Sequence, residues 1–160
     1  IVLTAPTGCQ RRIAEKDKYI VEFLSRPVRF DHTYSPDRAA DSLLFGTKPK
    51  LIHYIDSSGC ISCKFSDLKL WSVVHKHFRI PVVLVCETRY RLQSINWRFP
   101  VVYDTAGLFR TNNRISTPVL QTFLLDSGNH PLIVGNPIGN TQLWNLYEKE
   151  SARLTDIRER

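Results

Sequence analysis

The chain has 160 residues and a formal net charge of +7, with 42% hydrophobic and 23% charged residues. This balance is typical of one globular domain and excludes disordered, collagen-like and coiled-coil chains. No apolar run approaches the roughly 18 residues of a membrane-spanning helix. Basic residues are spread along the chain, so we expect a solvated basic surface and no nucleic-acid partner. There is no Met, and the four Cys residues, at positions 9, 60, 63 and 86, carry most of the functional information.

The first eight residues, 1–8, are uncharged and mostly apolar or small, and Cys9 and the polar run 10–12 follow them. Bacterial lipoprotein signals end in small residues before a Cys that becomes lipidated. We therefore predict that residues 1–8 are the remnant of a signal peptide and that Cys9 carries a lipid anchor. The absence of an initiator Met fits that prediction. A frayed apolar terminus with an incidental Cys is the alternative.

The next segment predicts one helix followed by a connector. Between Ala14 and Ser25 the apolar residues recur at helical spacing on one face. From Asp31 to Pro49 the chain holds two prolines, a glycine and several polar residues, which predict a connector. We expect at most a short strand or turn near Val28 to Phe30.

A regular alternation of strands and helices then begins. Leu51 to Ile55 and Val82 to Cys86 are compact apolar runs of strand length, and Val101 to Tyr103 is a third. Between them, Cys63 to Phe78 has apolar residues at steps of three or four, and Thr88 to Trp97 also fits a helix. Strands that alternate with helices predict a parallel sheet with helices on both faces.

The last part of the chain predicts a hairpin and a helix. Thr122 to Asp126 and Leu132 to Val134 are apolar runs joined by a turn that contains Gly128. Asn140 has the side chain of a helix cap, and apolar residues follow it. We therefore expect antiparallel strands at one edge of the sheet and a C-terminal helix.

The sharpest chemical feature is the C-x-x-C of Cys60 and Cys63, between a predicted strand and a predicted helix. At a helix N-terminus, unpaired N–H groups and the helix dipole favour a thiolate, which is the attacking species in disulfide exchange. Two intervening residues let Cys63 reach Cys60. We therefore predict that Cys60 is the exposed nucleophile and Cys63 the resolving thiol.

Zinc binding and a static disulfide are the alternatives for this pair. Zinc needs four ligands, and His75 and His77 lie about 18 Å along the same helix from Cys63. A disulfide in so short a ring removes little chain entropy. We expect no metal and no organic cofactor.

The other candidate residues have simpler interpretations. Cys86 ends an apolar strand and is expected to be a small buried hydrophobe. His53 lies inside a strand and is expected to pack in the interior. His75 and His77 lie near the end of a helix, where a cation is favourable, and are expected to be surface or packing residues.

These residues together resemble the thioredoxin fold, and more narrowly the thioredoxin-like lipoproteins of Bacteroidota, near the cytochrome-maturation type of thiol–disulfide oxidoreductase. In those proteins a GC-x-SC segment, here residues 59–63, recurs with a late segment that matches residues 121–126 and 135–137. The resemblance covers about residues 50–147. It implies a three-layer α/β sandwich, with a central mixed sheet, helices on both faces, a closing hairpin and a C-terminal helix.

The resemblance also implies a function and a domain organisation. We expect a thiol–disulfide oxidoreductase of the bacterial envelope, in the periplasm or on the outer surface, that acts on protein thiols and disulfides. The predicted divisions are residues 1–8, the signal remnant; residues 9–49, the N-terminal helix and connector; residues 50–150, the thioredoxin-like domain; and residues 151–160, a tail or helix extension. A non-catalytic binding or redox-sensing lipoprotein is the alternative, and copper or haem-thiol handling is a third.

Two departures from the thioredoxin pattern bear on catalysis. Thioredoxins place a cis-proline just before the strand that corresponds to Thr122–Asp126, and here that position is Leu120, with Pro118 two residues earlier. A non-proline cis bond costs about 2.5–4 kcal/mol, so we expect a trans bond at Leu120. Thioredoxins also bury an acid six residues before the first Cys, where this chain has Tyr54, with Asp56 nearer but at the end of the strand.

Overall fold

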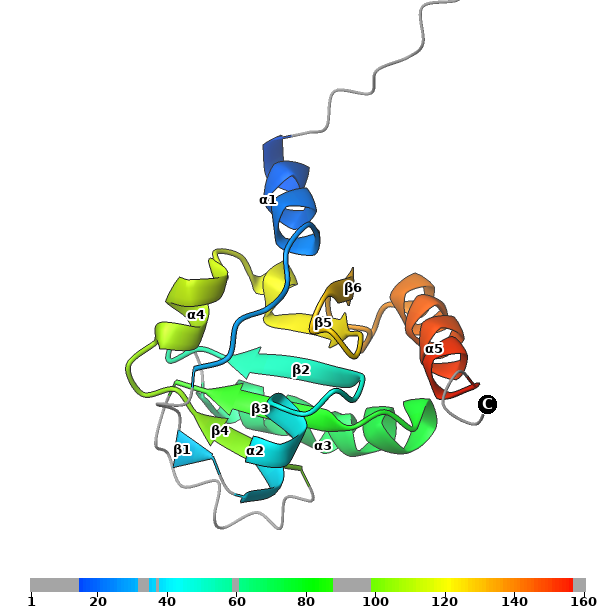
Figure 1. The fold of residues 1–160 in the computed structure, drawn as a ribbon, viewed down its shortest axis with the longest axis horizontal. Helices are drawn as coiled ribbons and strands as arrows, with labels where there is room; N and C mark the ends of the chain where they lie inside the picture. The colour runs from blue at the N-terminus through cyan, green and yellow to red at the C-terminus, as the bar shows by residue number, and fades with distance from the viewer. Residues whose placement is uncertain (1–14, 32–34, 37, 59–60, 88–98, 157–160) are drawn as a thin grey trace, which may run out of the picture.

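The computed structural model describes residues 15–31, 35–36, 38–58, 61–87 and 99–156. A six-stranded mixed sheet lies at the centre, in the order β1-β4-β3-β2-β5-β6, between two layers of helices (Figure 1). The strands are β1 (Ser35–Pro36), β2 (Lys50–Ile55), β3 (Val82–Cys86), β4 (Val101–Tyr103), β5 (Thr122–Leu125) and β6 (Pro131–Val134). The helices are α1 (Glu15–Leu24), α2 (Arg38–Leu44), α3 (Ile61–Phe78), α4 (Leu108–Asn113) and α5 (Thr141–Asp156), with a 3-10 turn, η2 (Pro118–Gln121).

The pairing of the strands confirms the predicted mixed sheet. Strands β2, β3 and β4 run parallel, as the strand–helix alternation predicts. The predicted hairpin is the antiparallel pair β5 and β6, which joins the sheet through an antiparallel pairing of β5 with β2. β2 is therefore a central strand with a parallel neighbour on one side and an antiparallel neighbour on the other.

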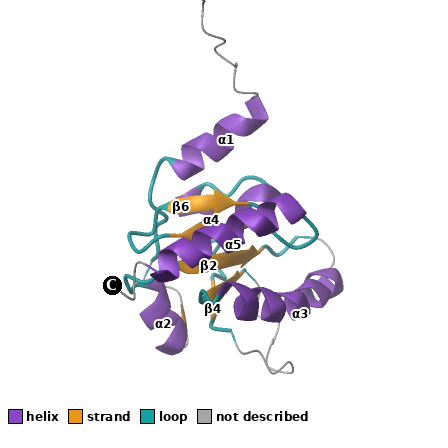
Figure 2. Ribbon diagram, turned by 90° about the vertical axis from the view of Figure 1, so that its right-hand side faces the viewer, coloured by secondary structure: helices purple, strands orange, loops and turns teal. Residues whose placement is uncertain are grey.

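Alternation along β2 divides the core between the two faces of the sheet. Ile52 and Tyr54 belong to one cluster of buried side chains, with residues of α1, α2 and α4. Leu51 belongs to a second cluster, with residues of α3 and α5. We call these the α4 face and the α3 face. α1 stands beyond the β6 edge of the sheet (Figure 2), and its Phe23 reaches into the cluster of the α4 face.

The two long helices of the α3 face follow the sequence pattern. The apolar side chains that recur along α3 are buried: Leu68, Trp71, Val74 and Phe78. On α5, Tyr147 is buried and its ring lies 5.8 Å from that of Phe78. Asn140 caps α5 as predicted, because its side-chain oxygen accepts a hydrogen bond of 3.1 Å from the backbone N–H of Leu143.

The predicted connector over residues 31–49 is wrong in part, because it contains β1 and α2. The seven-residue helix α2 ends where the Nζ of buried Lys50 donates to the carbonyl oxygens of Leu43, Leu44 and Gly46, at 2.7, 2.9 and 3.0 Å. Because Lys50 belongs to β2, the cap comes from outside α2. The residues of α2 therefore do not have to include a strong helix-ending residue. Residues 28–30 form no strand, although the N–H of Val28 donates to the carbonyl of Asn129.

The helix α4 was not predicted at all. The carboxylate of Asp104 accepts hydrogen bonds from the N–H groups of Leu108 and Phe109, at 2.8 and 2.7 Å, and so satisfies two of the unpaired donors at its start. Phe109 is fully buried between the rings of Phe30, Tyr54 and Phe123. One buried ring and one remote carboxylate therefore hold this short helix against the sheet.

The helix predicted over Thr88–Trp97 and the signal remnant at residues 1–8 lie outside the described residues. The domain boundaries at residues 9, 50 and 151 stay predictions. Among the helices that the structure describes, none has both the length and the apolar character needed to cross a membrane.

Candidate active site

The predicted reactive pair belongs to the junction between β2 and α3. α3 begins at Ile61, two residues earlier than predicted, and Cys63 lies in its first turn. Cys60 and Cys9 lie outside the described residues. Ile55, the last residue of β2, pairs with Cys86, the last residue of β3, so both parallel strands end at the same edge. In open α/β sheets, the carboxyl ends of parallel strands are where ligands bind.

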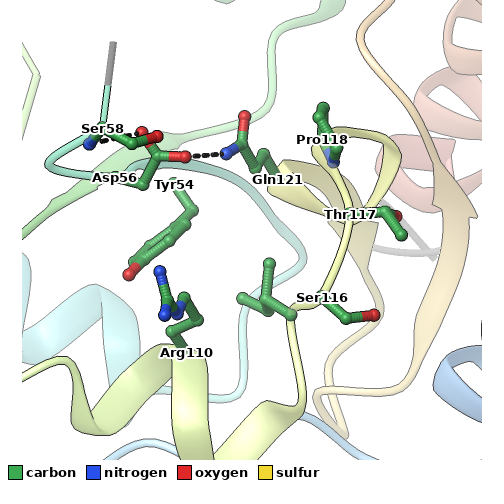
Figure 3. A pocket seen from close by; sticks show the side chains of 9 residues that line it. Tyr54, Asp56, Ser58, Arg110, Ser116, Thr117, Pro118 and Gln121 are labelled. Atoms are coloured by element: carbon green, nitrogen blue, oxygen red, sulfur yellow. Dashed lines mark hydrogen bonds between the residues drawn. The ribbon is translucent and has the colours of Figure 1, made fainter.

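A cavity of about 340 Å³ opens beside this junction (Figure 3). Its lining comes from the end of β2, from α4 and from the segment that leads into β5: Tyr54, Asp56, Ser58, Arg110, Ile115, Ser116, Thr117, Pro118 and Gln121. Ser58 precedes Cys60 by two residues, so the chain enters the C-x-x-C from the wall of this cavity.

Asp56 connects three segments around the cavity. Its carboxylate pairs with the ammonium of Lys64 in α3, and it accepts a 2.7 Å hydrogen bond from the amide of Gln121 at the end of η2. The backbone N–H of Ser58 donates to it as well, at 3.2 Å. Burial raises the pKa of Asp56, but the hydrogen bonds from Lys64, Ser58 and Gln121 outweigh it and leave the pKa below its usual value. Asp56 is therefore an anion.

Tyr54, six residues before Cys60, stands where the resemblance predicts a buried acid, and the structure gives it a partner. Its hydroxyl donates a hydrogen bond to Glu87, which follows β3. Glu87 also accepts from the backbone N–H and the hydroxyl of Ser57, at 2.7 and 2.8 Å, and lies 3.6 Å from the guanidinium of Arg110. The carboxylate that contacts Tyr54 thus comes from the residue that directly follows β3.

The pKa values of Tyr54 and Glu87 are shifted in opposite directions. Burial, and then the hydrogen bond to Glu87, raise the pKa of Tyr54 well above its usual value, so the phenol keeps its proton. Burial raises the pKa of Glu87, but hydrogen bonds from Tyr54 and Ser57 outweigh it and lower the pKa overall. Glu87 is therefore an anion that holds the loop before Cys60 in place.

The two residues near the expected cis-proline position lie differently. Pro118 lines the cavity, whereas Leu120 is buried in the cluster of the α4 face and its N–H donates to the carbonyl of Thr117. Among the described residues every peptide bond is trans, as expected at Leu120. The assignment of either residue to the proline role stays a prediction.

The remaining predicted residues have packing roles. Cys86 is 3% exposed, which confirms the prediction of a small buried residue, and burial raises the pKa of its thiol to about 12. His53 stacks on Trp71 at 4.4 Å between ring centres and bonds to the hydroxyl of Thr122 at 2.9 Å. His75 bonds to the carbonyl of Ile80 at 3.2 Å.

His77 lies on the surface, 2.9 Å from the carboxylate of Glu148. Within the described ranges, no three side chains of the kinds that bind metals come together. The zinc alternative for Cys60 and Cys63 is untested by this, because Cys60 lies outside those ranges.

Comparisons with known proteins identify the fold. A thiol:disulfide interchange protein, DsbE, from Chlorobium tepidum superposes with a TM-score of 0.50 at 14% identity, over 77% of this chain and 97% of that one. This chain has the thioredoxin fold. The strands β4-β3-β2-β5-β6 form its central sheet, which confirms the predicted fold class.

Other solved structures with the thioredoxin fold match at similar identity. The C-terminal domain of a thiol–disulfide oxidoreductase from Bacteroides thetaiotaomicron has a TM-score of 0.49 at 17% identity, over 79% of this chain and 99% of that one. A secreted disulfide oxidoreductase from Mycobacterium tuberculosis has 0.46 at 17% identity, over 83% and 98%. No family model matches the chain, and no curated protein sequence matches it significantly.

Sequence reasoning missed two parts of this site. Glu87 follows an apolar strand, 33 residues after Tyr54, and no local pattern connects the two. Arg110 belongs to the unpredicted helix α4. Asp56 was noticed only as an acid near the strand end, although Lys64 in the first turns of a predicted helix was a signal for an ion pair.

Proposed function

We propose that this protein exchanges thiols and disulfides with other proteins through Cys60 and Cys63. The observation that carries the proposal is that Cys63 of the C-x-x-C lies in the first turn of α3, the helix that follows the central strand β2 of a thioredoxin fold. A helix N-terminus stabilises a thiolate, and thiolates attack disulfides. The cavity beside the junction of β2 and α3, which Ser58 lines, offers room for a partner chain.

In the reducing direction, the Cys60 thiolate attacks one sulfur of the partner disulfide. A mixed disulfide forms, and the other partner sulfur leaves as a thiolate and takes up a proton. The Cys63 thiol loses its proton and attacks Cys60, which releases the second partner thiol and leaves a Cys60–Cys63 disulfide. Two electrons have passed to the partner, and a dithiol reductant restores the pair.

The surroundings of the pair suit this chemistry. Lys64 directly follows Cys63, and it pairs with Asp56, so a cation and an anion are fixed beside the reactive segment. Tyr54 keeps its proton and Glu87 keeps its charge, so neither competes for the reacting proton near neutral pH.

Replacing Cys60 tests the proposal directly. The Cys60→Ser variant should lose essentially all reduction of a protein disulfide such as that of insulin, whereas Cys9→Ser, the matched control, should retain it. The alkylation rate of Cys60 should follow a pKa below the free value of about 8.5. Equal activity of parent and Cys60→Ser would contradict the mechanism.

We further propose that the protein acts outside the cytoplasm and is anchored through a lipid on Cys9. A working disulfide pair is favoured in an oxidising compartment, and the sequence before Cys9 has the form of a lipoprotein signal. Mass spectrometry of the membrane fraction should find acyl mass on Cys9. A chain recovered with residues preceding Cys9 intact would contradict the anchor.

A non-catalytic binding or redox-sensing domain is the second candidate. It is favoured by Tyr54 where the resemblance predicts an acid and by Leu120 where it predicts a proline. In that case Cys60 and Cys63 should oxidise and reduce reversibly, but the parent should show no turnover with any disulfide.

A further inference from the structure

A second cavity, of about 430 Å³, lies between α1 and α4. Its lining includes Tyr19 and Phe23 of α1 and Arg110 of α4. It shares Arg110, Ile115 and Ser116 with the cavity beside the C-x-x-C, so the two hollows are neighbours along one path. We call this second hollow the α1–α4 groove.

The groove has an excess of positive charge. Arg26, Arg110 and Arg114 line it, and among its described lining residues Glu22 is the one carboxylate. Glu22 is shared between two cations, because it pairs with Arg114 and lies 3.8 Å from Arg26. The side chains of Arg110 and Arg114 are 53% and 68% exposed, so a ligand can reach both guanidinium groups even though Arg110 also lies 3.6 Å from Glu87.

A third hollow, of about 180 Å³, extends the same basic surface. It shares Arg26 and Arg114 with the groove, adds Arg29, and has no carboxylate among its described lining residues. The three cavities share lining residues in turn, so they form a path that starts at the junction of β2 and α3 and becomes more basic away from it.

The basic wall is held in place by a buried side chain. Asn113 is 3% exposed, and its amide nitrogen donates to the carbonyls of Arg29 and Phe109, both at 2.9 Å. Its side-chain oxygen accepts from the N–H of Arg29 at 2.8 Å. The end of α4 is therefore fixed to the segment after α1, and the arginines on both sides keep their spacing without a ligand.

We propose that the α1–α4 groove binds an acidic segment of the partner protein, next to the disulfide that Cys60 and Cys63 exchange. Arginine presents a planar fork of donors that matches a carboxylate, so Glu and Asp side chains fit these cations. The rings of Tyr19 and Phe23 and the side chain of Ile115 give the groove largely apolar walls, which suit a peptide better than a small anion. The inference rests on the proposed function, because it names the partner's chemistry.

Binding can be measured without any disulfide. We would use a short fluorescein-labelled peptide rich in Glu and Asp, a matched peptide rich in Lys, and neither would contain Cys. The acidic peptide should bind the parent, and its binding should become weaker as salt is added. The double variant Arg26→Gln/Arg114→Gln should bind about tenfold more weakly, as expected for the loss of two partly exposed ion pairs.

Two further variants control for fold and charge. Lys76→Gln/Lys149→Gln removes the same charge from exposed positions of α3 and α5 and should leave binding within about twofold of the parent, because distant exposed charges are screened. Glu22→Gln removes the competing carboxylate and should tighten the acidic peptide. Equal binding of the acidic and basic peptides, or an equal loss in both double variants, would overturn the inference.

An activity assay separates this inference from the proposed function. Peptide disulfides with acidic or basic flanks would be compared with a small neutral disulfide. Arg26→Gln/Arg114→Gln should raise KM for the acidic substrate alone. Turnover without preference for acidic flanks would contradict the binding of acidic segments in the groove and would support the exchange reaction. Selective binding of the acidic peptide without turnover of any disulfide would support the groove as a docking site and would contradict the exchange reaction.

Discussion

The two faces of the sheet differ in what their buried polar side chains do for the helices that cover them. On the α4 face, Lys50, Asp104 and Asn113 are buried and each makes two or more hydrogen bonds to the backbone. On the α3 face, the indole nitrogen of Trp71 has no partner among the described residues. His53, which stacks on Trp71, bonds to Thr122.

This difference follows from the helices that cover each face. α2 and α4 are too short to be stable on their own, so buried polar side chains make the hydrogen bonds that the helix ends lack. α3 and α5 span 18 and 16 residues and are held by apolar and aromatic packing. The buried polar side chains of the α4 face therefore stabilise the ends of its short helices, whereas the unpartnered indole N–H of Trp71 on the α3 face adds little stability or reduces it.

Lys50→Met should give the largest effect. Met retains most of the side-chain volume but leaves the three carbonyls at the end of α2 without their donor, which should lower the free energy of unfolding by about 2–3 kcal/mol. Burial lowers the pKa of Lys50 to about 8, so the cap is charged at neutral pH. Denaturant unfolding measures the change, and an unchanged midpoint would show that the cap contributes nothing.

His53 should make the protein less stable in mild acid. Burial, and then the charge of Lys64, lower the pKa of His53 to about 3. Because the unfolded chain titrates near 6.5, it binds the proton first, and stability should fall by about 2 kcal/mol as pH drops from 6.5 to 4.5. Urea unfolding across this range measures the slope. His53→Gln should flatten it, and a parent that is equally stable at both pH values would contradict the prediction.

Trp71→Phe should give the smallest effect. The smaller ring loses some packing, but a buried donor without a partner disappears as well, so stability should stay within about 1 kcal/mol of the parent. The matched control is Tyr147→Phe on the same face, which removes a hydroxyl that donates to the carbonyl of Gly135 at 2.9 Å. We expect the control to cost about 1 kcal/mol. A Trp71→Phe loss far above that would mean that packing dominates.

The long elements could be predicted from the sequence. β3 is a continuous apolar run, and it is buried throughout. α3 repeats apolar residues at helical spacing, and four of them are buried: Leu68, Trp71, Val74 and Phe78. Burial of apolar surface is the main driving force of folding. Segments that are held by such burial therefore have a regular spacing of apolar residues that can be recognised in the sequence.

The short elements could not be predicted, because distant groups hold them. α2 depends on Lys50, and α4 depends on Asp104 and on a ring cluster that includes Tyr54 and Phe123. The same limit applies to the candidate site. The C-x-x-C was visible as a local motif, whereas the contact of Tyr54 with Glu87 exists only because β2 and β3 pair in the folded sheet.

The central position of β2 has a consequence for how the chain is made. Leu51 pairs with Val82 on one side and with Leu124 on the other, so its second neighbour is synthesised long after its first. A nascent chain that ends before Thr122 exposes one edge of an apolar strand, and such edges pair with other chains. Successful biogenesis therefore depends on protecting β2 until the hairpin of β5 and β6 arrives.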